Sequence, residues 1–146
     1  MLRGNHPARI DEKGRLKLPT PFRRFIEEKY GNEFFITSLT GEYVWIYPLP
    51  EWESIENRLA LLPSMNPAKR KFVDRTNYFG QQTSFDANGR LLIPSLLRRT
   101  AGVIGEVEVM GRLTHLAVWE AESFQRHLQL EPYTEADEAE IAALGI

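Results

Sequence analysis

The chain has 146 residues, 42% of them hydrophobic and including 8 Phe, 5 Tyr and 3 Trp, so it can form one or two small domains with a buried core. It contains no cysteine, which excludes disulfides and thiolate metal sites and fits a reducing compartment. No apolar run approaches the roughly 18 residues of a membrane helix. The N-terminus lacks the apolar segment of a secretory signal, so we expect a cytoplasmic protein.

The formal net charge of −2 is unevenly distributed along the chain. Residues 131–146 contain acidic side chains and no basic one, whereas basic residues are frequent among the first 30. A basic face combined with an acidic tail is compatible with DNA binding. The overall balance is far from one that would require a nucleic-acid partner.

The first 50 residues carry patterns typical of two hairpins separated by a helix. Asp11 to Gly14 indicates a turn, because Asp accepts backbone hydrogen bonds at turn starts and Gly tolerates positive φ. Thr20 is predicted to cap the helix, with Pro21 at its first position and Gly31 just past its end. The expected strand, strand, helix, strand and strand cover residues 8–10, 15–18, 21–30, 33–37 and 42–47.

The second half of the chain repeats this order after two helical segments. Residues 50–62 have apolar side chains at helical spacing, and Asn66 followed by Pro67 predicts a helix to about residue 78. Ser95 is the expected helix cap of the second copy. The other predicted elements are strands over 83–85, 90–93, 105–110 and 115–120 and helices over 96–101, 121–130 and 134–144.

The two copies share residues as well as element order. The string Asp-x-x-Gly-Arg-Leu occurs at residues 11–16 and again at 86–91, and each copy continues into an apolar residue, proline, a hydroxyl residue and an Arg-Arg pair. One such unit is too small to bury two hairpins and a helix. We therefore expect the copies to pack as an internal pseudo-dimer. The predicted shared core is formed by the aromatic strand residues Phe34, Phe35, Trp45, Tyr47 and Trp119.

Arg15 and Arg90 follow the turn glycines at the two hairpin tips. An arginine fork can bind guanine O6 and N7 in the major groove, which a β-hairpin can enter. The alternative is a structural bridge in which each aspartate holds its own arginine. The two interpretations are compatible, because a carboxylate can fix the orientation of a guanidinium that reads DNA. The predicted arginine-orienting and turn residues are Asp11, Gly14, Asp86 and Gly89.

The first tip is more basic than the second. Lys13, Lys17, Arg3 and Arg9 are candidate phosphate contacts, and a solvated basic face is an equally good interpretation of them. Asn88 stands at the second tip in the place of Lys13, where it could bind a base edge, although favouring the turn is the better interpretation. The Arg-Arg pairs at 23–24 and 98–99 could serve phosphates or an interface, although a solvated surface is the better interpretation.

No enzyme template matches the chain. The 3 His residues are too scattered for known zinc spacings, and neither a nucleophile elbow nor a phosphate loop is present. We therefore predict no catalytic residue, no metal, no cofactor and no small-molecule substrate.

Several strings resemble the MraZ family of bacterial transcriptional regulators. They are Met-Leu-Arg-Gly at the N-terminus, the two Asp-x-x-Gly-Arg-Leu units, Tyr47 to Glu53, Met65 to Pro67, Leu92 to Pro94 and Leu97-Arg98. The resemblance spans residues 1 to about 130 and leaves out the tail. It implies an α+β fold of two tandem ββαββ AbrB-like swapped-hairpin modules forming a pseudo-dimeric β-barrel flanked by helices.

The resemblance also implies a function and a set of partners. It predicts a nucleoid-associated regulator that binds double-stranded DNA at its own promoter, usually as a repressor of the division and cell-wall gene cluster. It predicts a ring-shaped homo-oligomer that reads repeated short sites. The family's signature positions fall on Asp11 and Arg15 and on Asp86 and Arg90, with Lys13 and Arg3 in matching stretches.

The expected organisation has four parts. Modules cover residues 5–52 and 81–124, a helical linker covers 53–80, and an acidic helical tail covers 125–146. Two alternatives stay open: an assembly module that binds no DNA, and an antitoxin-like regulator whose acidic tail folds on a toxin.

Overall fold

The computed structural model describes all residues from 1 to 146 and contains eight strands and six helices. The strands are β1 (Asn5–Ile10), β2 (Arg15–Lys17), β3 (Glu33–Thr37), β4 (Val44–Pro48), β5 (Gln81–Ser84), β6 (Arg90–Leu92), β7 (Gly105–Gly111) and β8 (Leu116–Trp119). The helices are α1 (Thr20–Lys29), α2 (Leu49–Leu59), α3 (Pro67–Tyr78), α4 (Ser95–Ala101), α5 (Ala121–Leu130) and α6 (Glu135–Ala142).

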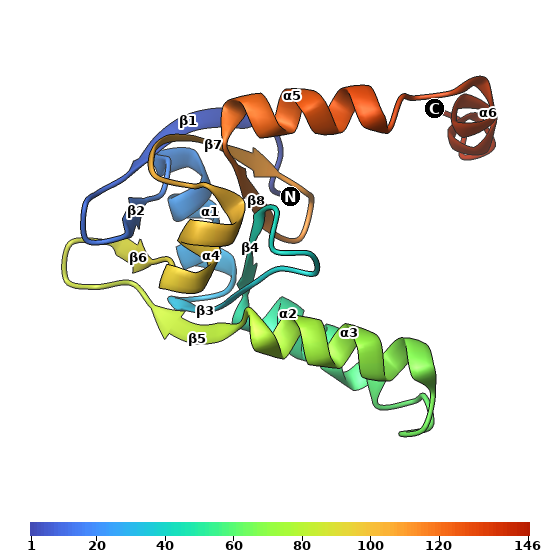
Figure 1. The fold of residues 1–146 in the computed structure, drawn as a ribbon, viewed down its shortest axis with the longest axis horizontal. Coiled ribbons are helices and arrows are strands. Elements are labelled where there is room, and N and C mark those ends of the chain that lie inside the picture. Colours follow the sequence, from blue (N-terminus) through green and yellow to red (C-terminus); the bar gives the residue numbers. More distant parts are fainter.

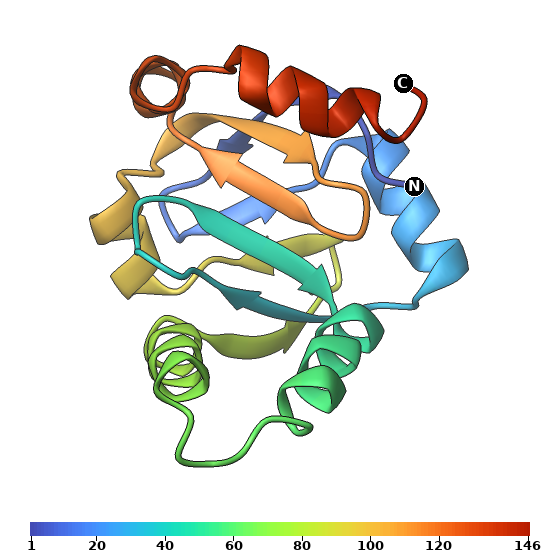
Figure 2. The same cartoon turned by 90° about the vertical axis from the view of Figure 1, so that its right-hand side faces the viewer.

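The strands of the two repeats interleave in one antiparallel sheet of eight strands, in the order β5-β3-β4-β8-β7-β1-β2-β6. The first hairpin of each repeat pairs with the second hairpin of the other, through β1 with β7 and β5 with β3. The sheet curls into a barrel-like shape (Figure 1), and α1 and α4 cover its two opposite flanks (Figure 2). The predicted α+β fold of two swapped-hairpin modules is thus confirmed. The predicted boundaries of the modules and the linker, at residues 52, 80 and 124, stay a prediction.

A pseudo-twofold relation between the repeats is visible in the strand register. Leu16 pairs with Leu91 at the centre of the β2–β6 contact, with Arg15 opposite Leu92 and Lys17 opposite Arg90. Arg15 corresponds to Arg90 in the repeat, and Lys17 corresponds to Leu92. Each residue of one strand therefore has the same position relative to the centre as its counterpart has in the other strand, as a twofold axis through the Leu16–Leu91 pair requires. The prediction of an internal pseudo-dimer follows from the repeated sequence and is confirmed by this pairing.

The helix starts differ from the prediction. Pro19 and Pro94 occupy the cap positions of α1 and α4, no side chain caps either helix, and Thr20 and Ser95 are already helical. The prolines hold the extended backbone angles that a cap residue needs, so the hydroxyl is not required to end the strand. Asn66, by contrast, caps α3 as predicted, because its Oδ1 accepts the Lys69 N–H at 3.0 Å.

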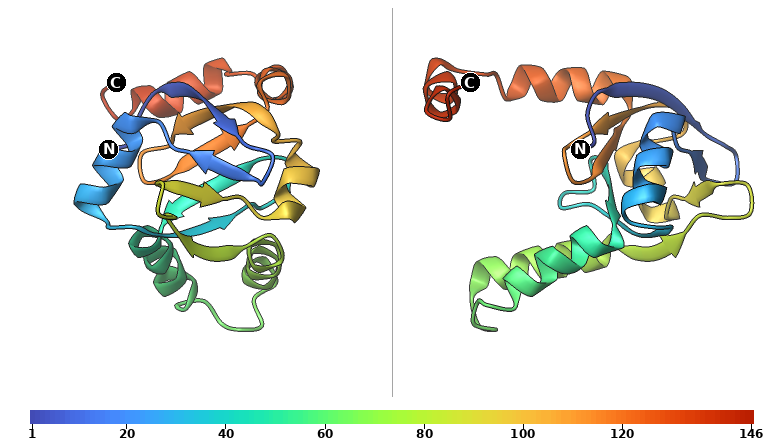
Figure 3. Two further views of the ribbon diagram at one scale, coloured as in Figure 1. Left: turned by 90° about the vertical axis from the view of Figure 1, so that its left-hand side faces the viewer. Right: turned by 180° about the vertical axis from the view of Figure 1, so that it is seen from behind.

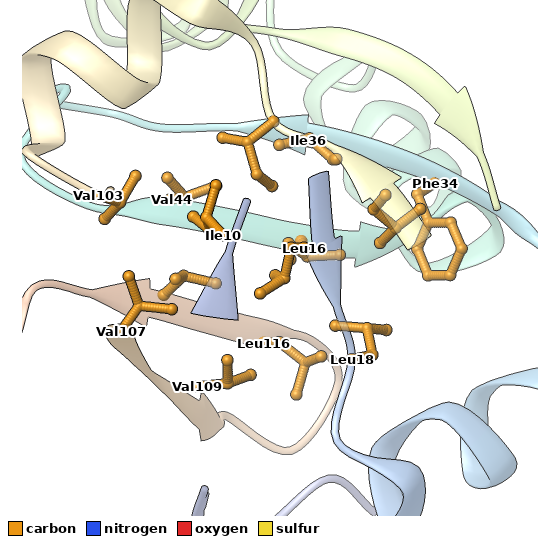
Figure 4. Close-up of a cluster of buried hydrophobic side chains, with 14 of the residues drawn as sticks. Ile10, Leu16, Leu18, Phe34, Ile36, Val44, Val103, Val107, Val109 and Leu116 are labelled. Atoms are coloured by element: carbon orange, nitrogen blue, oxygen red, sulfur yellow. The ribbon is translucent and has the colours of Figure 1, made fainter. Parts of the chain in front are cut away.

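The core is aliphatic rather than aromatic. Side chains from both repeats point into it, among them Leu16, Ile36, Val44, Val107 and Leu116 (Figure 4). Of the aromatic strand residues predicted for the core, Phe34 belongs to this cluster. Tyr47 and Trp119 are also buried, but on the other face of the sheet, because successive side chains of a strand point to opposite faces. The predicted burial is thus confirmed for Phe34, Tyr47 and Trp119, whereas Phe35 and Trp45 are half-buried and the five do not form one shared cluster.

The other aromatic residues form a layer on the outer face of the sheet, beneath the helices. Trp52 of α2 stacks on Phe35 at 4.8 Å between ring centroids, and Phe72 of α3 stacks on Trp52 at 6.2 Å. Phe124 of α5 packs edge-on against Trp119 at 5.3 Å. This layer fixes α2 and α5 to the barrel.

The molecule has two distinct ends. The β1–β2 and β5–β6 turns project from one end of the barrel, and the helix pairs α2–α3 and α5–α6 extend from the other (Figures 1 and 3). Viewed from the helical end, α5–α6 and α2–α3 lie on opposite sides of the sheet (Figure 2). None of the helices has the length and apolar character needed to span a bilayer.

Candidate nucleic-acid interface

The two hairpin tips lie next to each other because β2 pairs with β6. This pairing brings together Arg15 and Arg90, which are 75 positions apart in the sequence, and the two turns lie side by side at one end of the barrel (Figure 3, left). The predicted tip residues of both repeats therefore form one surface.

Each aspartate organises its own turn. Asp11 Oδ1 accepts the backbone N–H groups of Lys13 and Arg15, both at 2.9 Å. Asp86 Oδ1 accepts those of Asn88 and Arg90, at 2.8 and 3.0 Å. These donors stabilise the ionised carboxylate and lower the pKa of Asp11 and of Asp86 below its ordinary value.

The second oxygen of each aspartate faces the arginine of the other repeat. Arg15 Nε lies 3.8 Å from Asp86 Oδ2, and Arg90 Nη1 lies 3.8 Å from Asp11 Oδ2. A bridge between each aspartate and its own arginine is therefore not what the structure contains. These contacts are longer than hydrogen bonds, and both arginine side chains are 42% exposed. The carboxylates therefore orient the guanidinium groups, while the N–H donors of the arginines stay free to bind another molecule.

The turn glycines are needed for two reasons. Gly14 and Gly89 have φ of +85° and +73°, where a side chain is strained. A Cβ at Gly14 would also displace the guanidinium end of Arg98, and one at Gly89 that of Arg23, so the close approach adds to the strain at positive φ. Each turn thus lies against an arginine from the helix of the other repeat.

Arg23 and Arg98 lie beside the tips, a position that the sequence did not reveal. They were expected at the solvated surface with Arg24 and Arg99. Arg98 Nε instead donates to the Ile93 carbonyl at 3.0 Å and Arg23 Nε to Glu27 Oε1 at 2.8 Å. The only available signal was that glycine and arginine recur at the same spacing in both repeats, which does not reveal that they meet across the repeats.

A cavity of about 420 Å³ opens at the first tip. Its lining is wholly polar and combines four basic residues with two acidic ones: Arg9, Lys13, Arg15, Arg90, Asp11 and Glu12. Arg9 joins the surface because it lies at the end of β1 beside the turn. Exposed cations around a polar hollow match the chemistry of phosphates and base edges.

The surroundings of the two tips differ. Lys13 and Lys17 of the first repeat correspond to Asn88 and Leu92 of the second, and all four side chains are exposed. Arg3 precedes β1 and lies beside Gly111, at the end of that strand opposite the β1–β2 turn. The structure does not bring Arg3 together with the other predicted site residues.

The chain has relatives along its whole length. A family model described as "MraZ protein, putative antitoxin-like" matches residues 1–75 and 80–143. The transcriptional regulator MraZ of Acidobacterium capsulatum is 53% identical over 146 residues, and that of Koribacter versatilis 48% over 147, each alignment covering 100% of both chains. That of Syntrophobacter fumaroxidans is 35% identical over 129 residues, covering 88% of this chain and 85% of the relative.

The chain belongs to the MraZ family. The resemblance seen in the sequence is confirmed, with one correction. The family match extends to residue 143, so it includes most of the tail that was expected to lie outside it.

Proposed function

We propose that the chain regulates transcription by binding double-stranded DNA through its two hairpin tips. The observation that carries this proposal is the reciprocal arrangement in which each arginine is oriented by the aspartate of the other repeat. Such an arrangement presents two guanidinium forks at a fixed separation, which is what recognition of base edges requires. The relatives from Acidobacterium capsulatum and Koribacter versatilis are named transcriptional regulator MraZ, which supports it.

Each tip residue has a role in this proposal. Arg15 and Arg90 bind base edges, Asp11 and Asp86 orient them, and Gly14 and Gly89 allow the turns. Lys13, Lys17 and Arg9 contact phosphates. Asn88 donates its backbone N–H to Asp86, which leaves its side-chain amide for a base edge. Arg3 is left out of the contact set because of its distance from the tips.

The finer function follows the family resemblance. We propose that the protein binds repeated short sites upstream of its own gene, at the head of the division and cell-wall cluster, and represses it at the nucleoid. A ring of subunits would present many tips to such a row of sites, and linked binding raises the effective concentration of each further contact. This compensates for the weak overall charge of −2.

The test is a binding titration on the upstream region with Arg15→Ala and Arg90→Ala. Each change should lower the preference for specific over unrelated DNA by about 1–3 kcal/mol per contacted site. Arg24→Ala is the matched control, since Arg24 is exposed on α1 and takes part in none of the ion pairs. Unchanged affinity of both tip variants would exclude the base-reading role.

A footprint with native mass measured alongside separates this function from an assembly module. Oligomers without salt-dependent DNA retention would favour assembly alone. An antitoxin-like role is a second candidate, because the family description includes it and every residue from 131 to 146 is exposed. It requires a stable complex with the product of a neighbouring toxin gene, measured by co-expression and purification.

A further inference from the structure

A groove runs along α3 at the helical end of the molecule, far from the hairpin tips. Its volume is about 900 Å³, and its floor is apolar, with Leu39 of the β3–β4 turn and Phe72 and Phe79 of the α3 segment. Lys71, Arg75 and Asp74 form its rim. Both basic side chains are exposed and neither has an acidic partner among the four ion pairs of the chain.

The second repeat lacks a counterpart of this helix. In the first repeat α2 packs on the barrel through Trp52 and is covered in turn by Phe72 of α3. In the second, α5 packs in the equivalent way through Phe124, but no helix returns along it and none of its residues is buried. The chain instead continues outwards into α6 (Figure 1).

The C-terminal arm, residues 121–146, ends without contacts that would hold it. All residues from 131 onwards are exposed, and α6 has 8 residues. An isolated helix of that length is unstable in water even with a good cap. A stable α6 therefore requires a surface that its own subunit does not provide.

The arm and the groove are complementary. The arm exposes the apolar side chains of Leu128, Leu130, Tyr133 and Ile141. Its α6 segment bears the acidic residues Glu135, Asp137, Glu138 and Glu140, none of them in an ion pair with a basic group. The groove offers an apolar floor and two cations that are in no ion pair, Lys71 and Arg75, which outnumber its one acidic residue, Asp74.

We propose that the C-terminal arm of one subunit docks in the α3 groove of a second copy of this chain, with Glu138 and Glu140 facing Lys71 and Arg75. A second copy is required because the arm and α3, which lines the groove, lie on opposite sides of the barrel within one subunit (Figures 1 and 2). One copy's arm on the next copy's groove is a head-to-tail contact, which closes into a ring or continues as a chain. The inference rests on the proposed assembly and not on DNA contact by the tips.

The test is sedimentation velocity of the full-length protein without DNA at low salt. Truncation after Leu130, Lys71→Glu with Arg75→Glu, and Glu138→Lys with Glu140→Lys should each shift the protein to smaller species. For the charge reversals we expect about a tenfold weaker association, which is reasonable for two reversed surface pairs. The combination of all four charge changes should restore assembly, because the opposite charges face each other again.

Arg24→Glu with Arg99→Glu is the matched control, with the same change of charge on exposed residues of α1 and α4. It should leave the size distribution unchanged. Circular dichroism establishes that each variant is folded. Three results would overturn the proposal. They are a wild type that is monomeric throughout, a truncated protein that still assembles, and a quadruple variant that stays dissociated.

A DNA titration of the same variants keeps this inference apart from the proposed function. If the arm docks as inferred, the dissociated variants still bind a single short site through their tips but lose the advantage on a row of sites. Tip variants such as Arg15→Ala should show the reverse pattern, with normal assembly and weakened binding to each site. Assembly that fails only in the tip variants would contradict the arm–groove contact.

Discussion

The two repeats are nearly identical where they touch and different where they face solvent. At the tips the reciprocal Arg–Asp contacts have the same length of 3.8 Å and nearly the same exposure. Around them Lys13 and Lys17 are replaced by Asn88 and Leu92, and on the outer face Tyr43 of the first repeat corresponds to His115 of the second. The two repeats thus share their geometry where they pack together, whereas their solvent-facing positions differ in charge and their outer-face positions differ in residue type.

The largest expected effect tests the part that is the same. Leu16 and Leu91 are each fully buried and pair with each other across the pseudo-twofold relation. Leu16→Ala and Leu91→Ala should therefore lower the free energy of unfolding by a similar amount, about 2–5 kcal/mol each. Urea denaturation at one fixed protein concentration measures this. Leu92→Ala, at a half-exposed position, is the control and should cost little. Clearly unequal losses at residues 16 and 91 would show that the repeats do not share one core.

The next effect concerns the outer face, where the repeats differ. His115 stacks on Tyr47 at 4.1 Å between ring centroids, its Nε2 is buried without a hydrogen-bond partner, and burial, assisted by Arg112, lowers the pKa of His115 to about 4. Between the ordinary value of 6.5 and about 4, the unfolded chain therefore binds a proton that the folded chain does not. The contribution of neutral His115 to the free energy of unfolding is fully present above pH 6.5. It falls by roughly 1–3 kcal/mol as the pH falls from there to about 4.

His115→Phe should flatten this pH dependence, because the buried ring no longer titrates. Urea denaturation at pH 7, 6 and 5 provides the comparison. Tyr43→Phe is the matched variant at the equivalent position of the first repeat and should leave the slope as it is in the wild type. An unaltered slope in His115→Phe would mean that other groups cause the acid sensitivity.

The smallest expected effect separates the two tips. Lys13→Ala should weaken binding to all DNA sequences about equally and reduce the salt dependence by roughly one phosphate contact, whereas Asn88→Ala should leave the salt dependence unchanged. Leu92→Lys gives the second repeat the lysine of the first and should raise the salt dependence by a similar amount. DNA titrations on one short site at several salt concentrations measure all three. Equal salt slopes for Lys13→Ala and Asn88→Ala would show that the tips bind alike.

The sequence alone was sufficient for features that depend on neighbouring residues. The turns at Asp11–Gly14 and Asp86–Gly89 follow from local hydrogen bonding and positive φ, and they form as predicted. The duplicated string indicated a pseudo-dimer, because one unit cannot bury its own apolar faces. The Asn66 cap of α3 is equally local.

What depends on the packing of one repeat against the other came only from the tertiary structure. Equal spacing cannot reveal that Asp86 lies beside Arg15 or that Arg98 covers Gly14, because these contacts join residues far apart in the chain. The strand aromatics illustrate the same limit: alternation states that Phe34 and Phe35 face opposite ways, but only the position of α2 decides which side is the core. The sequence determined the repeated unit and its turns, and the swapped pairing of the hairpins decided that two separate tips become one surface.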